Sequence, residues 1–181
     1  MPVETLTEPE ALEWLEVAAS CVPEGQAIVE LGTYRGGSLK YLVAGASDSV
    51  QVFGVDAWGQ GDIYRGRPHM LDRYRLTDKR VAARVAKGAT LIHNTTIQAA
   101  AEYDGPPVGC LYIDAEHRFD SVLADYTAWA PHLAEDAVVA FDDYGGDKGK
   151  QVIQAVDHLI AEGRLVWVEK IGERLAITRP A

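Results

Sequence analysis

The sequence predicts an open α/β fold of about seven strands, most of them parallel. Short, continuous apolar runs alternate along the chain with amphipathic stretches. The apolar runs are not broken by regularly spaced polar residues, a pattern typical of strands buried on both faces of a parallel sheet. The last two runs are joined by a tight Gly172-Glu173 turn, which indicates a hairpin at the end of the sheet.

The expected strands are short apolar segments. They are Ala27–Leu31, Val50–Val55, Thr90–His93, Cys110–Ile113, Ala137–Phe141, Leu165–Ile171 and Arg174–Thr178. The intervening segments carry apolar residues at helical spacing. The expected helices are Ser38–Ala46, Pro68–Lys87, Thr96–Tyr103, Phe119–Leu133 and Lys148–Glu162.

A further helix is expected near the N-terminus. Thr7 precedes Glu10 by three residues, which is the spacing of a capping box with Thr7 as the N-cap. Apolar residues then hold helical spacing as far as the Pro23-Glu24-Gly25 turn, which ends the helix. No internal repeat or flexible linker interrupts the chain, so we expect a single domain over residues 1–181.

Composition and charge exclude several classes of protein. No apolar run approaches the roughly 18 residues that a membrane helix needs, and the N-terminus lacks the pattern of a signal peptide. The two cysteines, Cys21 and Cys110, are too few for a disulfide scaffold and are not in metal-binding spacing. The sequence therefore predicts a cytoplasmic protein. Its net charge of −10 disfavours nucleic acid and anionic membranes as partners.

One segment departs from this acidic character. Residues 60–90 hold eight basic and three acidic side chains, so the segment is +5 and the rest of the chain is −15. The stretch Asp62–Lys87 is interpreted either as a lid that recognises an anionic group on the substrate or as an exposed amphipathic helix. In the helix interpretation, which we favour, Val81 and Val85 face inward and the arginines face water.

Ligands of open α/β sheets bind beyond the carboxyl ends of the strands. The first strand is followed by Glu30-Leu31-Gly32-Thr33-Tyr34-Arg35-Gly36-Gly37-Ser38, in which glycines allow a sharp turn and the close approach of a ligand. This is not the GxGxxG fingerprint of dinucleotide-binding proteins, and an acidic residue precedes it. A carboxylate at Glu30 suits a ligand that carries a cationic amine.

A second carboxylate, Asp56, follows the second strand. A carboxylate at this position can accept hydrogen bonds from the hydroxyls of a ribose. An Asp that only caps a helix or a loop is the competing interpretation. Because the glycine-rich loop precedes Asp56 by about 20 residues, the spacing of nucleotide-binding folds, the ribose interpretation is preferred.

The glycine-rich loop, Asp56 and the order of elements resemble class I S-adenosylmethionine-dependent methyltransferases. Two further motifs narrow the resemblance. Tyr112-Ile113-Asp114-Ala115-Glu116-His117-Arg118-Phe119 is similar to the D-x-x-H-x-[YF] signature of metal-dependent small-molecule O-methyltransferases of the macrocin and sugar type, and Val138–Tyr144 carries their paired acidic residues. The resemblance implies a Rossmann-like seven-stranded sheet, with an antiparallel last strand and helices on both faces.

The resemblance also implies which residues bind the cofactor S-adenosylmethionine. Its methionine part would lie against the glycine-rich loop, its ribose against Asp56, and its adenine near Thr95 and Thr96. The full set of expected cofactor-binding residues is Glu30, Gly32, Thr33, Tyr34, Gly36, Ser38, Asp56, Ala57, Thr95, Thr96 and Asp114.

Three carboxylates are expected to meet beside this cofactor site. Asp114 and the pair Asp142-Asp143 follow neighbouring strands, and their mutual repulsion would be relieved by a divalent cation such as Mg²⁺. Such a cation would lower the pKa of a substrate hydroxyl. His117 or Asp114 would then accept the hydroxyl proton, and the sequence does not decide between them.

The predicted function is transfer of a methyl group to a hydroxyl of a small molecule, such as a sugar or a catechol-like ring. A metal-independent methyltransferase of other specificity, including N-methylation, is the alternative among enzymes. The alternatives from other classes are a nucleotide-binding oxidoreductase, which the missing fingerprint disfavours, and a non-catalytic cofactor-binding module. The oligomeric state stays open, with a homodimer among the possible assemblies.

Overall fold

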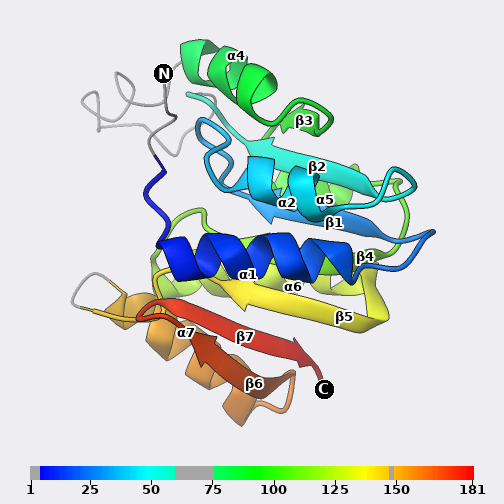
Figure 1. The fold of residues 1–181 in the computed structure, drawn as a ribbon. Coiled ribbons are helices and arrows are strands. Elements are labelled where there is room, and N and C mark those ends of the chain that lie inside the picture. Colours follow the sequence, from blue (N-terminus) through cyan, green and yellow to red (C-terminus); the bar gives the residue numbers. More distant parts are fainter. Residues whose placement is uncertain (1–4, 60–75, 147–148) are drawn as a thin grey trace.

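The computed structural model describes residues 5–59, 76–146 and 149–181, which form a seven-stranded sheet with helices on both faces (Figure 1). The strand order is β3-β2-β1-β4-β5-β7-β6. The strands are β1 (Ala27–Leu31), β2 (Gln51–Asp56), β3 (Thr90–His93), β4 (Val108–Ile113), β5 (Leu133–Phe141), β6 (Leu165–Ile171) and β7 (Leu175–Pro180).

The first five strands are parallel, and β7 lies antiparallel between β5 and β6. The predicted fold class is therefore confirmed. The register brings the carboxyl ends together, because Leu31 at the end of β1 pairs with Val55 in β2 and with Ile113 in β4. In Figure 1 the arrowheads of β1, β2 and β5 lie on one side of the sheet, where the chain also enters the first helix.

The helices form two layers. Buried residues of α1 (Pro9–Ser20) and α2 (Leu39–Gly45) pack on one face, and those of α5 (Thr96–Ala101), α6 (Phe119–Trp129) and α7 (Lys150–Ala161) pack on the other. Neighbouring residues of a strand enter different layers, as Ile28 and Val29 of β1 do. This explains why the strands are continuously apolar in sequence. No helix of the described part of the chain is long and apolar enough to cross a membrane.

Some boundaries differ from those expected. The helix that begins at Phe119 ends at Trp129 and continues as one 3₁₀ turn over Ala130–His132. Pro131 lies in that turn and cannot donate the backbone hydrogen bond of a continuing α-helix. The helix expected over Pro68–Lys87 is described from Leu76 only, as α4 (Leu76–Val85), and its expected first half lies outside the described residues.

The capping box expected at Thr7 and Glu10 is wrong. The N-cap of α1 is Glu8, and its side chain makes no capping hydrogen bond. The carboxylate of Glu8 instead accepts hydrogen bonds from the backbone N–H of Glu173 (3.0 Å) and from Nε of Arg174 (3.2 Å). Pro at the first turn favours this later start, since a helix can begin at a residue that lacks an N–H.

Candidate functional site

The loop that follows β1 turns back sharply at the carboxyl edge of the sheet. Gly32, Tyr34 and Gly36 all have positive φ, of 93°, 48° and 76°. A Cβ added at Gly32 would lie 2.0 Å from the carbonyl oxygen of Asp114, so only glycine fits there. The loop backbone is therefore in contact with Asp114, the residue that follows β4, as expected for a shared site.

Glu30 lies fully buried in β1 beneath this loop. Its Oε1 accepts a 2.5 Å hydrogen bond from the hydroxyl of Ser38, at the N-cap of α2. Its Oε2 and the hydroxyl of Thr33 are both buried and have no hydrogen-bond partner among the described residues. Burial raises the pKa of Glu30 to about 8, against the opposite effect of the Ser38 hydrogen bond. An unpartnered carboxylate oxygen suits a ligand that brings a positively charged donor.

Asp56, at the end of β2, connects the glycine-rich loop to the segment that follows β2. Its Oδ2 accepts a hydrogen bond from the N–H of Tyr34 (2.7 Å) and its Oδ1 accepts one from the N–H of Trp58 (2.8 Å). The indole Nε1 of Trp58 returns a 2.7 Å hydrogen bond to the carbonyl of Tyr34. Burial raises the pKa of Asp56, which these two N–H groups oppose. Each carboxylate oxygen keeps a second lone pair, as contact with ribose hydroxyls would require.

The segment expected near the adenine is occupied by structural contacts. Thr95 is the N-cap of α5 and accepts a hydrogen bond from the N–H of Gln98. The hydroxyl of Thr96 donates to the carboxylate of Asp125, a buried side chain of α6. Ala57 is buried, and its carbonyl oxygen lies 2.8 Å from Nε2 of His93.

The helix α4 packs against the glycine-rich loop. Arg35 in the loop forms a 2.8 Å ion pair with the buried Asp78, and Ala82 lies against Gly36. The ammonium of Lys79 lies 5.5 Å from the ring centroid of Trp58. The inner side of α4 therefore supports the loop and its neighbour, Trp58.

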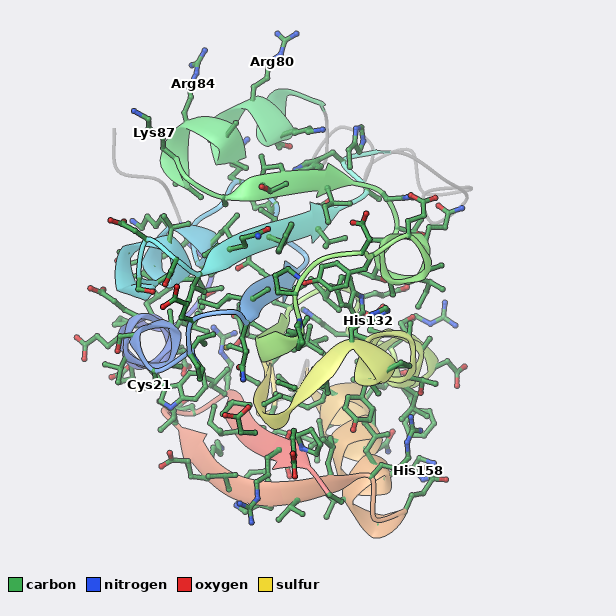
Figure 2. The ribbon with its side chains drawn as sticks, turned by 90° about the vertical axis from the view of Figure 1, so that its right-hand side faces the viewer. Cys21, Arg80, Arg84, Lys87, His132 and His158 are labelled. Carbon is green, nitrogen blue, oxygen red and sulfur yellow. The ribbon has the colours of Figure 1, made fainter. Side chains whose placement is uncertain are left out.

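The outer side of α4 and the turn that follows it carry the basic row, which we define as Arg80, Arg84 and Lys87. All three are exposed, and Figure 2 shows them pointing away from the body of the molecule. Val81 and Val85 are half-buried. This arrangement agrees with the exposed amphipathic helix for residues 76–85. The rest of the basic segment, residues 62–75, lies outside the described residues.

Two carboxylates and an imidazole meet at the ends of β4 and β5. One ligand atom each from Asp114, His117 and Asp143 lies within 4.8 Å of the others, a geometry that could hold a metal ion. Nε2 of His117 is 3.5 Å from Oδ1 of Asp114, and its Nδ1 is 3.1 Å from Oδ2 of Asp143. We refer to these three residues as the Asp–His–Asp group.

Asp142 lies beside this group but has a different partner. It is buried, and its Oδ2 accepts a 3.0 Å hydrogen bond from the hydroxyl of Tyr112. Its Oδ1 is buried without a hydrogen-bond partner in the described structure. The cluster that the structure brings together thus contains His117 where the sequence predicted Asp142.

Two members of the Asp–His–Asp group, Asp114 and His117, have raised pKa values. Burial raises the pKa of Asp114 to about 7, which the neighbouring His117 ring opposes. The interaction with Asp114 in turn raises the pKa of His117, while burial lowers it. A group that titrates near neutral pH can accept a proton from a substrate hydroxyl.

Sequence reasoning missed two residues of this region. Tyr112 precedes Asp114 by two residues in β4, and that spacing could have placed it on the same face of the strand. Arg174 donates a 3.0 Å hydrogen bond from Nη1 to Oδ1 of Asp143. It lies far along the chain, just before β7, and no local motif indicates its role.

Comparison with known proteins relates the chain to one family. Residues 29–144 match the sequence model of the methyltransferase-domain family. Over 119 residues the chain is 30% identical to the uncharacterized protein y4gI of Sinorhizobium fredii, and the alignment covers 64% of this chain and 13% of that protein. The chain therefore spans about an eighth of that relative's length.

Solved structures share the fold at low identity. A cofactor-bound structure of Rv0187 from MTB superposes with a TM-score of 0.70 at 14% identity, covering 97% of this chain and 82% of that one. An O-methyltransferase from Bacillus cereus in complex with SAH gives a TM-score of 0.69, again at 14% identity and with the same coverage. These likenesses show the fold.

Proposed function

We propose, from the premise that the chain belongs to the methyltransferase-domain family, that this S-adenosylmethionine-dependent methyltransferase acts on a hydroxyl group of a small molecule. One observation carries the proposal. The Asp–His–Asp group, which can accept a proton, directly adjoins the glycine-rich loop, because Gly32 lies against Asp114. Cofactor and acceptor hydroxyl could therefore meet at one place, as methyl transfer requires.

The residues around the loop fit the cofactor. Oε2 of Glu30 would receive the ammonium of its methionine part, and the free lone pairs of Asp56 would receive the ribose hydroxyls. S-adenosylmethionine supplies an electrophilic methyl carbon bonded to a sulfonium. Thr95 and Thr96 remain proposed adenine contacts through atoms other than their hydroxyls, because both hydroxyls have structural partners.

In the reaction, the substrate oxygen would form a bond to the methyl carbon while the carbon–sulfur bond breaks. The hydroxyl proton would pass to His117 or to Asp114, and the two assignments are tested below. The products would be the methylated substrate, S-adenosylhomocysteine and a proton. The pKa of Asp114, raised to about 7 by burial, supports the role of this residue as the base. The pKa of His117 is also raised, by its interaction with Asp114.

The Asp–His–Asp group also fits a divalent cation. Its donors are two carboxylate oxygens and one imidazole nitrogen, which suit Mn²⁺ as well as Mg²⁺. A bound cation would lower the pKa of a hydroxyl placed next to it. Asp142 could join the ligands through Oδ1, which has no partner among the described residues, while its Oδ2 keeps the hydrogen bond from Tyr112. His117 could not use one nitrogen both to bind the cation and to accept the proton, so a metal-bound His117 would leave the second carboxylate oxygen of Asp114, the one that does not bind the cation, as the base.

A metal-independent methyltransferase is a second candidate, favoured by one specific observation. Asp143 already faces two potentially cationic groups, Arg174 at 3.0 Å and His117 at 3.1 Å. These can compensate its charge without a metal. A small hydroxylated substrate, a cytoplasmic location, a homodimer and the lack of nucleic-acid partners remain proposals from the sequence.

The test is transfer of labelled methyl groups to a panel of catechols and sugars, with and without a chelator. We expect turnover of at least one hydroxylated acceptor, loss of turnover with the chelator, and its return with Mg²⁺ or Mn²⁺. His117→Ala and Asp114→Asn, each assayed across pH, distinguish the two bases, because the true base sets the acidic limb of the rate profile. Turnover that the chelator leaves unchanged would favour the metal-independent candidate.

A further inference from the structure

Arg174, just before β7, uses three of its nitrogens at the carboxyl edge of the sheet. Nη1 donates to Oδ1 of Asp143 at 3.0 Å, Nε donates to Oε1 of Glu8 at 3.2 Å, and Nη2 donates to the carbonyl of Leu6 at 3.1 Å. The planar guanidinium holds these three acceptors in a fixed relative geometry, which a lysine ammonium could not do. One side chain therefore connects the N-terminal segment to the Asp–His–Asp group.

On one side, Arg174 fixes the conformation of Asp143. The backbone of Asp143 is in the left-handed region, with φ of 55°. The next residue, Tyr144, donates a 2.6 Å hydrogen bond from its N–H to the carbonyl of Arg174. The two carboxylate oxygens have separate partners, since Oδ1 accepts from Arg174 and Oδ2 faces Nδ1 of His117. Arg174 thereby directs Oδ2 of Asp143 toward His117.

On the other side, Arg174 holds the segment that leads into α1. Oε2 of Glu8 accepts a second hydrogen bond from the N–H of Glu173, so Glu8 is fastened to two neighbouring residues of the β6–β7 turn. Farther back, the side chain of Thr5 packs against Gly37 of the glycine-rich loop, where an added Cβ would lie 3.0 Å from it. The segment thus runs along the edge from the glycine-rich loop to Arg174 (Figure 1).

We propose that Arg174 is a positioning residue that couples two events: the binding of a divalent cation at the Asp–His–Asp group and the docking of residues 6–8. The inference rests on the proposed function in that it takes this group to bind a cation. Glu8 and Leu6 hold Arg174, and Arg174 keeps Oδ2 of Asp143 in position. The affinity for a cation that binds Oδ2 is therefore higher when residues 6–8 are docked. By reciprocity, the bound cation stabilises the docked segment to the same extent.

The test measures Mn²⁺ alone, by the loss of the free-ion electron paramagnetic resonance signal, in Arg174→Lys and Glu8→Gln variants of the metal-free chain. Arg174→Lys keeps the positive charge and loses the planar guanidinium that holds the three acceptors. Glu8→Gln changes a residue that faces the guanidinium and not the Asp–His–Asp group. Arg164→Lys and Glu162→Gln are the matched controls, because they alter an Arg–Glu pair away from the site. S-adenosylmethionine affinity is measured on every protein.

We expect both test variants to bind Mn²⁺ about tenfold more weakly than the wild type, within the usual range of coupling between two sites. The controls should stay within about twofold, the scale of a minor surface pair. Unchanged or tighter Mn²⁺ binding in Arg174→Lys overturns the inference. That result is expected if the Arg174 guanidinium only competes with Mn²⁺ for Asp143 and does not position its carboxylate. Weakening in Arg174→Lys but not in Glu8→Gln overturns the coupling.

A wild type that binds S-adenosylmethionine but no Mn²⁺ removes the cation and this inference together, and absence of cofactor binding contradicts the proposed function itself.

Discussion

Ser38 donates a 2.5 Å hydrogen bond to Glu30 and thereby joins the two ends of the glycine-rich loop, one in β1 and the other at the start of α2. Only one oxygen of Glu30 is satisfied in this way, and the other is buried without a partner among the described residues. Burial raises the pKa of Glu30 from 4.5 to about 8. The carboxyl is therefore mostly protonated at neutral pH until a cationic ligand favours its charged form.

Glu30 should make the stability of the ligand-free protein depend on pH. Its pKa is higher in the folded state than in the unfolded state, so the folded state binds more protons between pH 4.5 and about 8. The contribution to stability is fully present below pH 4.5 and is lost as the pH rises through about 8, at a cost on the order of a few kcal/mol. Glu30→Gln should lack this loss. Urea unfolding of both proteins at pH 5, 7 and 9 tests this, and parallel stability curves would contradict the buried position of the carboxyl.

Gly32 should tolerate no side chain, for reasons of space rather than of backbone angle. Gly25 provides the matched control, because its φ of 85° resembles the 93° of Gly32 while nothing lies within 4 Å of an added Cβ. Gly25→Ala should cost about 1–2 kcal/mol for the left-handed conformation alone. Gly32→Ala should cost a further 1–3 kcal/mol or more from overlap with the Asp114 carbonyl, and it should weaken cofactor binding. Equal losses of unfolding free energy in the two variants would contradict the close contact.

Thr96 should affect stability more than cofactor affinity, because its hydroxyl donates to the buried Asp125. Thr96→Val removes that donor and should cost about 1–3 kcal/mol of unfolding free energy. Burial already raises the pKa of Asp125 to about 6, and loss of the Thr96 hydrogen bond should raise it further. Calorimetry of the cofactor should give a dissociation constant within about twofold of the wild type, less than the loss of one ligand hydrogen bond. A large loss of affinity at unchanged stability would instead establish Thr96 as an adenine contact.

The basic row should not contribute to cofactor binding. Arg80 and Arg84 point away from the sheet, whereas the neighbouring Lys79 and Ala82 face Trp58 and the glycine-rich loop. Glu substitutions at Arg80 and Arg84 together should leave the melting temperature and the S-adenosylmethionine affinity nearly unchanged at 0.1 M salt, where exposed charges more than about 10 Å apart are screened. A tenfold loss of affinity would assign this helix face a part in ligand recognition.

The sheet was predictable from the sequence because its signal is local. The run Ala27–Leu31 is buried at every position, and the more exposed run Thr90–His93 has the apolar pair Leu91-Ile92 at its centre. The structure gives both runs the predicted boundaries. The helix ends were less predictable, as at Thr7, where the side chain of Glu8 serves a distant turn instead of the cap. A capping pattern in the sequence does not show whether a distant partner, such as the β6–β7 turn, binds the side chains near the helix start instead.

The candidate site was predictable where a motif is contiguous. The glycine-rich loop, and Asp114 with His117, are brought to one edge by parallel strands, as the sequence indicates. Arg174 was not predictable, because it reaches that edge only through the antiparallel direction of β7. The partner of Asp142 depends on which way its carboxylate turns, toward Tyr112 or toward the group, and sequence spacing does not determine a side-chain rotamer.

The most direct test of the proposed function is calorimetric titration of S-adenosylmethionine into the metal-free protein, repeated with Asp56→Ala and then with Mg²⁺ or Mn²⁺ as the titrant. We expect saturable cofactor binding in the wild type, its loss in Asp56→Ala, and cation binding that Asp143→Ala abolishes. Cofactor binding with no cation binding would retain the methyltransferase and remove the metal from its chemistry. A folded wild-type protein that does not bind S-adenosylmethionine at all would contradict the central claim.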